Sequence, residues 1–215
     1  MATKLGIFNE ALFEVGDRQL TDTGEDREAA RTCVMRYDRC VADCLEEASW
    51  NFAMETVQLD ADTGVEPSFG SRSEVFAKPT DWVRTHAISA DEDFVNPLDD
   101  YVDEVNFLSS SVSPIYVKYV SNDTGMGLDL ARWPASFTRY VELQLAWRIL
   151  PRINQDEKIK DRIKDDLDMA RKNAKNKDAL NEVQPKYPPP GKWTRSRSGR
   201  GGGWQDRGSR NSLTG

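Results

Sequence analysis

Apolar side chains recur at helical spacing over the first fifty residues of the chain. Residues 4–15 carry them three or four positions apart, which predicts an amphipathic helix, and Gly16 follows where a C-terminal cap belongs. A second helix is expected to begin after Thr23, whose hydroxyl can cap it, and to end near Ala48. Its apolar face would hold Ala30, Cys33, Tyr37, Val41, Cys44, Leu45 and Ala48.

The pattern changes to short alternating segments after Trp50-Asn51-Phe52-Ala53. These segments are rich in β-branched and aromatic residues, and Pro, Gly, Asn, Asp and Ser separate them, as is typical of strands joined by turns. Together they predict one small antiparallel sheet. Its strands are expected at residues 56–59, 75–77, 83–88, 101–107 and 115–120.

Helical spacing returns after Trp133-Pro134. Pro134 suits the first turn of a helix, and Pro151 is expected to stop or kink that helix. A last helix over residues 155–180 has a narrow apolar stripe, acidic residues at its start and basic residues near its end, which complements the helix dipole. A long helix with charge on most faces is typical of a surface or inter-subunit element.

From residue 184 the sequence is rich in Pro, Gly and Arg and has no apolar periodicity. We therefore predict an α+β protein, mainly a helical bundle with a small antiparallel β insert and an extended C-terminal arm. The bundle would be built from residues 1–53 and 134–183, the insert from 54–133 and the arm from 184–215. The aromatic residues expected to anchor the bundle at its junctions are Trp50, Phe52, Trp133 and Phe137.

Charge divides the chain into an acidic body and a basic arm. The net charge is −7, yet residues 186–215 hold seven basic side chains and one acidic one, while the remainder holds 22 basic and 35 acidic side chains. This asymmetry indicates a partner for the arm. Its expected docking residues are Lys192, Trp193, Arg195, Arg197, Arg200, Trp204 and Arg207.

Two kinds of partner fit the composition of the arm. Arg, Gly and aromatic residues interleave as they do in segments that bind nucleic acids by phosphate contacts and base stacking. The same residues suit an extended peptide that folds onto another protein, with Trp and Arg as its anchors. Composition alone does not separate these alternatives.

The residues that could carry chemistry do not form a recognisable catalytic motif. Cys33, Cys40 and Cys44 lie near one face of one helix, far in sequence from His86, so we expect core residues and no metal site. His86 is explained by its place in a strand and is not expected to act as a general base. Gly-Lys phosphate loops, GxSxG and HExxH motifs are absent from the sequence.

The one enzyme that the sequence could suggest is a small metal-dependent hydrolase. Its metal would be bound by the acidic residues at 91–93, 99–100 and 103–104. They fall in predicted turns, where carboxylates are usually just solvated. We expect no catalytic residues, no metal and no cofactor. The sequence also contains no apolar run of the roughly 18–20 residues that span a membrane and no signal-peptide pattern, so we expect a protein made in the cytoplasm without a membrane partner.

Six segments, taken in order, point to one family. They are EALFEVGDRQL, EDREAARTCVMRYDRCVADCLEEASWNFA, the turn Lys78-Pro79-Thr80-Asp81-Trp82-Val83-Arg84, PIYVKYVSND, WPASFTRYVELQLAWRI and MARKNAKNKDALNE. This run, over residues 4–183, resembles the head-to-tail adaptors of short-tailed phages (podoviruses), also called tail tubular protein A. The most specific element is the order Ala-Arg, Tyr-Asp, Leu and Trp-Asn-Phe-Ala in the second segment. The Gly- and Arg-rich arm departs from the composition usual in the family.

The resemblance implies a structural virion protein at the head–tail junction. Such a protein would form a ring, commonly of twelve subunits, that connects the portal to the tail during genome retention and ejection. The helical part and the arm would contact the portal protein, and the β insert would contact the tail nozzle or tail tube. Genomic DNA would pass through the lumen without sequence-specific binding, which an acidic body would favour. The alternative is a nucleic-acid-binding protein that acts through the arm.

Overall fold

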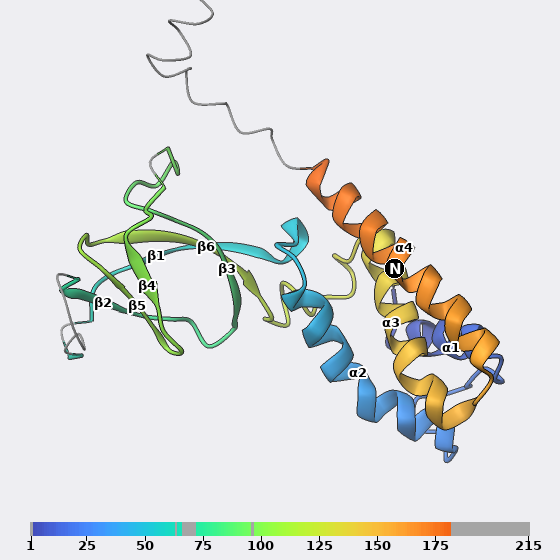
Figure 1. Cartoon of the computed structure of the whole chain (residues 1–215). Helices are drawn as coiled ribbons and strands as arrows, with labels where there is room; N and C mark the ends of the chain where they lie inside the picture. Colours follow the sequence, from blue (N-terminus) through green and yellow to red (C-terminus); the bar gives the residue numbers. More distant parts are fainter. Residues whose placement is uncertain (1, 63, 66–71, 96, 182–215) are drawn as a thin grey trace, which may run out of the picture. The chain divides into compact units, whose positions relative to one another are not determined.

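The computed structural model describes residues 2–62, 64–65, 72–95 and 97–181. Within these residues, 44% helix and 19% strand confirm the α+β class (Figure 1). The expected extended arm lies outside them. The helices are α1 (Lys4–Val15), α2 (Glu28–Glu46), the short 3-10 helix η1 (Asn51–Ala53), α3 (Ala135–Ile153) and α4 (Glu157–Ala179). The strands are β1 (Met54–Leu59), β2 (Glu74–Ala77), β3 (Trp82–Ser89), β4 (Tyr101–Asp103), β5 (Phe107–Ser110) and β6 (Ile115–Ser121).

Helix α1 has the bounds that its apolar spacing predicts. The Thr3 hydroxyl accepts a hydrogen bond from the Gly6 amide at 3.1 Å and caps its start. Gly16 ends the helix in the left-handed conformation, with φ of 82°, which glycine adopts without the steric cost of a Cβ. The predicted C-terminal cap is therefore confirmed.

Helix α2 begins at Glu28, so the predicted cap at Thr23 is wrong. The reason is a set of contacts made by the preceding loop. The Arg27 guanidinium donates to both carboxylate oxygens of Asp17 at 3.2 Å, and Asn9 exchanges two hydrogen bonds with the backbone of Leu20. These long-range bonds hold the loop in a non-helical path up to Arg27.

Pro134 lies one position before its predicted place, and Pro151 does not stop the helix. Pro134 precedes α3 as its N-cap residue, and Pro151 lies inside the last turn of a helix that continues to Ile153. Proline removes only one backbone donor there, and the Asn154 amide still donates to the Leu150 carbonyl at 2.8 Å. The helix therefore continues for two residues past Pro151.

Helix α3 is the centre of the bundle, since it packs against α1, α2 and α4. The shared core is apolar and includes Phe8, Leu12, Cys33, Val41, Leu45, Trp50, Phe137, Leu145, Ile149 and Ile163. No helix within the described residues is both long enough and apolar enough to cross a membrane.

The strands form two three-stranded antiparallel sheets, whereas the sequence predicted one. One sheet has the order β1-β6-β3 and the other has the order β2-β5-β4. The predicted strand at 101–107 is wrong, because Glu104, Val105 and Asn106 turn the chain between β4 and β5. The Glu104 amide donates to the Phe107 carbonyl at 2.9 Å and closes this hairpin.

Strand β6 connects two hydrophobic cores. Its residue Val120 belongs to the core of the helical bundle, together with Ala53 just before β1. Ile115 and Val117 belong to a second core, which also holds Phe76, Ile88 and Leu108 from both sheets. The sheet β1-β6-β3 thereby joins the bundle to the rest of the β region.

Candidate functional site

Four aromatic side chains meet where the bundle joins the first sheet. Phe137 lies among the other three, with ring centroids 4.8 Å from Trp50, 4.7 Å from Phe52 and 4.9 Å from Trp133. Its contacts with Trp50 and Trp133 are edge-on, an arrangement that aromatic quadrupoles favour. Phe52 is partly exposed and the other three are buried.

The indole N–H group of each buried tryptophan donates a hydrogen bond to a backbone carbonyl. The Trp50 indole donates to the Cys44 carbonyl at 2.8 Å, and the Trp133 indole donates to the Gly127 carbonyl at 2.8 Å. Gly127 itself passes so close to the Ser121 carbonyl that an added Cβ would lie 2.1 Å from that oxygen. These contacts are local in sequence, since each indole bond spans six residues, and they fix the path of the chain on both sides of the aromatic cluster.

The end of α4 is bonded to the same junction. The Asn51 amide donates to the two carboxylate oxygens of Asp178 at 3.0 and 3.2 Å, and the Asn51 side chain donates to the Asp178 carbonyl at 2.9 Å. Hydrogen bonds to a charged acceptor are stronger than neutral ones. The last turn before the described residues end is therefore held to η1.

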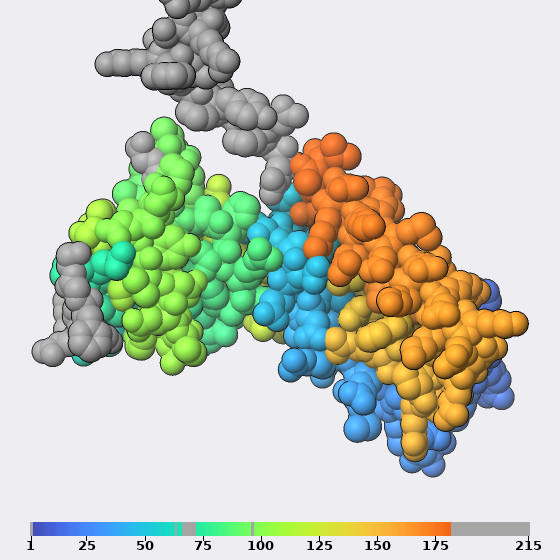
Figure 2. Space-filling view, in the orientation of Figure 1, coloured from blue at the N-terminus to red at the C-terminus, as the bar shows by residue number. Residues whose placement is uncertain are grey.

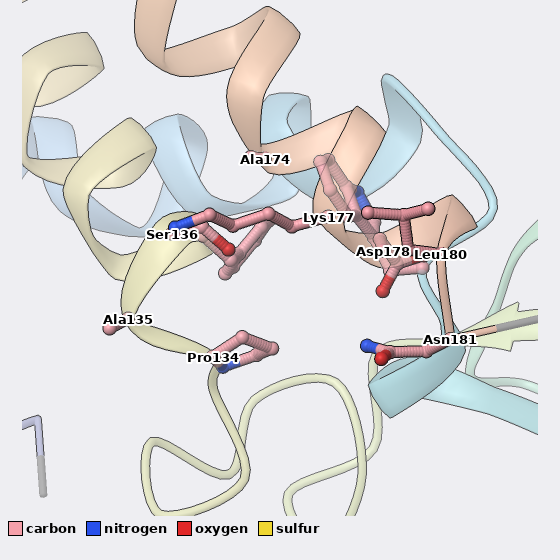
Figure 3. Close-up of a pocket in the computed structure, with 10 residues that line it drawn as sticks. Pro134, Ala135, Ser136, Ala174, Lys177, Asp178, Leu180 and Asn181 are labelled. Carbon is pink, nitrogen blue, oxygen red and sulfur yellow. The ribbon is translucent and has the colours of Figure 1, made fainter.

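A hollow of about 420 Å³ lies beside this bonded pair (Figure 3). Figure 3 shows Pro134, at the start of α3, on one side and Leu180 and Asn181, at the end of α4, on the other. The lining is mainly apolar. Its carboxylate, Asp178, is already engaged by Asn51, and its ammonium group belongs to Lys177. Such a hollow suits an apolar side chain better than acid–base chemistry.

The Lys78–Arg84 turn is a structural motif in this protein. The Asp81 carboxylate accepts hydrogen bonds from the Ser121 hydroxyl and, at 3.2 Å, from the Tyr119 hydroxyl. Trp82 stacks on the Tyr119 ring with a centroid distance of 4.4 Å and an interplanar angle of 7°. Burial, and then the carboxylates of Asp81 and Glu55, raise the pKa of Tyr119. The tyrosine therefore keeps its proton and stays neutral, and its hydroxyl donates a hydrogen bond to these carboxylates.

The same turn connects the sheet to the bundle. The Arg84 guanidinium donates to the Glu46 carbonyl at the end of α2, at 3.3 Å. Val83 packs against the bundle core, and Lys78 forms an ion pair with Asp103. The turn residues therefore position the sheet against the end of α2.

The three cysteines lie in the core of the bundle. Cys33, Cys40 and Cys44 are buried and free of disulfides. Burial raises the pKa of the Cys33 thiol to about 12 and raises that of Cys44 well above its ordinary value. Thiols bind metals as thiolates, so these environments disfavour coordination.

We expect removal of metal ions to leave the fold unchanged. Treatment of the purified protein with excess EDTA should not shift its thermal melting curve, because neutral buried thiols supply no anionic ligand. Calorimetry before and after treatment, with metal analysis of the same sample, measures this. Stoichiometric zinc together with a large fall in melting temperature would contradict it.

The acidic runs and His86 do not converge on one site. His86 is exposed on β3. Asp100 pairs with Arg72 and Asp103 pairs with Lys78, while Glu92 is exposed. Among the residues that the structure describes, no three His, Cys, Asp or Glu side chains are grouped to hold a metal. The carboxylates instead make the β region acidic, with fifteen acidic and five basic residues between positions 54 and 133.

A groove of about 810 Å³ between α2 and α3 is positively charged, in contrast to the acidic β region. Both helices reach the surface in Figure 2. The groove is lined by four arginines and one glutamate, together with the exposed side chain of Met35. The arginines are Arg31, Arg36, Arg148 and Arg152. The sequence-based prediction missed this feature because the two pairs of arginines are more than a hundred residues apart. Met35, an apolar residue outside the predicted apolar face of its helix, is the one clue in the sequence.

Glu142, on α3, has an unusual carboxyl group. Its side chain is 13% exposed. Burial raises its pKa to about 7; Arg139 at 3.8 Å opposes this shift, and Glu10 and Glu14 add to it. In the folded protein, Glu142 therefore holds its proton from its ordinary pKa of 4.5 up to about pH 7.

This environment predicts a pH-dependent stability. As pH rises from 4.5 to about 7, the folded state keeps a proton that the unfolded state has lost, so the free energy of unfolding falls. Glu142→Gln should remove this loss and stabilise the protein above pH 7 by on the order of 1 kcal/mol after solvent screening, with little effect below pH 4.5. Urea unfolding on both sides of this window measures the difference. Glu92→Gln, in an exposed loop, is the control, and an equal gain in both variants would contradict the assignment.

The seven predicted docking residues of the arm, from Lys192 to Arg207, lie outside the described residues, and their role remains a prediction. The sequence matches no protein-family model, and a search of curated proteins found no significant relative.

Proposed function

We propose that this chain is a structural subunit of a tailed-phage head-to-tail connector, which forms a ring between the portal and the tail. The proposal is carried by one observation: the segments that resemble the adaptor family supply the residues that bond the helices and the sheet. Trp50 and Asn51 bond to the ends of α2 and α4, Asp81 and Trp82 bond and stack with Tyr119 in the sheet, and Arg84 bonds the sheet to the end of α2. The segments that carry the resemblance therefore supply contacts within the bundle, within the sheet and, through Arg84, between the two.

The surface charge agrees with a channel for DNA. The β region carries three acidic residues for each basic one. Phosphates are repelled by such a surface, whereas a basic wall would bind them strongly and slow the passage of the genome. An acidic lumen therefore suits a ring through which DNA moves without sequence-specific binding.

The helices carry exposed apolar side chains that suit contacts between proteins. Phe13 on α1, Met35 on α2 and Met169 on α4 are each more than 60% exposed. Aromatic residues and Met are enriched in the contact surfaces of protein complexes. In this proposal the helical part and the arm contact the portal, and the β region contacts the tail nozzle or tail tube.

The proposal is tested by mixing the purified protein with the portal protein encoded in the same genome. Negative-stain microscopy should show an added ring of density on one end of the portal, and size-exclusion chromatography should show both proteins in one peak. Separate peaks and bare portals would contradict the proposal. A gel shift with duplex DNA that requires residues 186–215, combined with bare portals, would favour the nucleic-acid-binding alternative.

A further inference from the structure

The groove between α2 and α3 holds positive charge that the subunit itself does not balance. Arg152 pairs with Glu28, and Arg148 pairs with Asp43. Arg36, in contrast, forms no ion pair or hydrogen bond within residues 2–62, 64–65, 72–95 and 97–181.

The remaining arginine of the groove is only weakly engaged. Arg31 contacts Asp26 at 3.2 Å, but both side chains are mostly in water, where ion pairs contribute little. Arg31, one helical turn before Met35, and Arg36, the next residue after it, line the groove together with Met35, which is 80% exposed. The groove thus offers an apolar contact flanked by two available guanidinium groups.

The turn between β4 and β5 has the complementary composition. Val105 is 91% exposed at its tip. Asp103 and Glu104 precede Val105 in the sequence. The Asp103 carboxylate forms an ion pair with Lys78. The Glu104 carboxylate has no partner in the described part of the chain, while its backbone amide closes the hairpin at 2.9 Å. The tip is therefore a fixed turn that presents an apolar side chain beside a free carboxylate.

We infer that the β4–β5 hairpin tip of one copy docks into the α2–α3 groove of the next copy. Val105 would cover Met35, and Glu104 would accept hydrogen bonds from Arg36, whose planar guanidinium binds a carboxylate at two points. The inference rests on the proposed function, because it names the surfaces by which neighbouring subunits join. Two different surfaces of one chain make a head-to-tail contact, which closes into a ring when it repeats around an axis. A nucleic acid would pair with the arginines but would leave Met35 in water, so a second copy is the better occupant.

A mixed disulfide tests the contact directly and does not need the portal. Met35→Cys protein is mixed under mild oxidation with Val105→Cys protein that carries a size tag. The mixed dimer should form at least about tenfold faster than with Val95→Cys protein, since docking raises the local concentration of the two thiols. Val95 is a matched control because it is 72% exposed in another loop of the β region. Equal rates in the two mixtures would overturn the inference.

Swapping the charges of Arg36 and Glu104 tests the same contact in rings assembled on the portal. Arg36→Glu alone and Glu104→Arg alone should each abolish rings on the portal, and the chain with both substitutions should recover them. Lys164→Glu, an exposed position on α4 with no ion pair among the described residues, should leave ring formation unchanged. Normal rings with both single variants, or no recovery in the double variant, would overturn the contact while leaving the proposed function intact. Bare portals with the unsubstituted protein would instead contradict the proposed function itself.

Discussion

Replacement of Trp50 by Ala is expected to lower the free energy of unfolding by about 3–5 kcal/mol, the usual cost of deleting a large buried aromatic side chain. Trp50 is 1% exposed and packs edge-on against Phe137. The substitution would also leave the Cys44 carbonyl without the indole donor at 2.8 Å. A cavity and an unsatisfied buried acceptor would therefore arise together at the junction of bundle and sheet.

Urea unfolding followed by circular dichroism measures this loss. The matched control is Trp147→Ala, also within the helical bundle, because Trp147 on α3 is 39% exposed and makes no ring contact with another described residue. We expect a clearly smaller change for the control. A change below about 0.5 kcal/mol for Trp50→Ala, the range of ordinary surface substitutions, would show that the junction does not depend on this side chain.

Deletion of residues 186–215 is expected to abolish assembly onto the portal while the melting temperature stays within about 1 °C of the full chain. The segment is basic, rich in Gly and Pro, and lacks apolar periodicity, so its sequence offers too little apolar surface to offset the entropy of ordering. Thirty extended residues can span up to roughly 100 Å, which is enough to reach a neighbouring ring. Its arginines would pair with carboxylates of the partner, and its tryptophans would fill apolar pockets.

Calorimetry of the shortened chain and microscopy of its mixture with portals measure the two effects. A full-length chain with Trp193→Ala and Trp204→Ala separates anchoring by the indoles from attraction by charge, and it should also lose assembly. A full-length chain with Ser209→Ala and Ser212→Ala should assemble normally. Normal rings without residues 186–215 would refute docking by the arm, and loss of DNA affinity alone would favour the nucleic-acid alternative.

The helical half of the fold could be predicted from local pattern. The bounds of α1 follow from apolar spacing and from Gly16, whose left-handed conformation is a property of the residue itself. The spacing of Cys33, Cys40 and Cys44 likewise placed them on one face, and that face is buried. These features depend on residues within a few turns of one another, so the sequence alone was enough.

Bonds between distant residues decided the rest. The start of α2 depends on Arg27 and Asp17, and the separation of β4 from β5 depends on how each strand pairs. Strand β6 lies between β1 and β3, an order that no local alternation of side chains encodes.

The candidate surfaces, too, depend partly on local sequence and partly on contacts between distant residues. Met35 and Val105 are visible in the sequence as apolar residues beside charges, but the groove forms only because α3 brings Arg148 beside α2. Asn51 and Asp178 meet across 127 positions of sequence. Composition and periodicity therefore determined which segments are helical, which are charged and which face inward. The tertiary structure determined which charges lack a partner, because that depends on the side chains that folding brings within hydrogen-bonding distance.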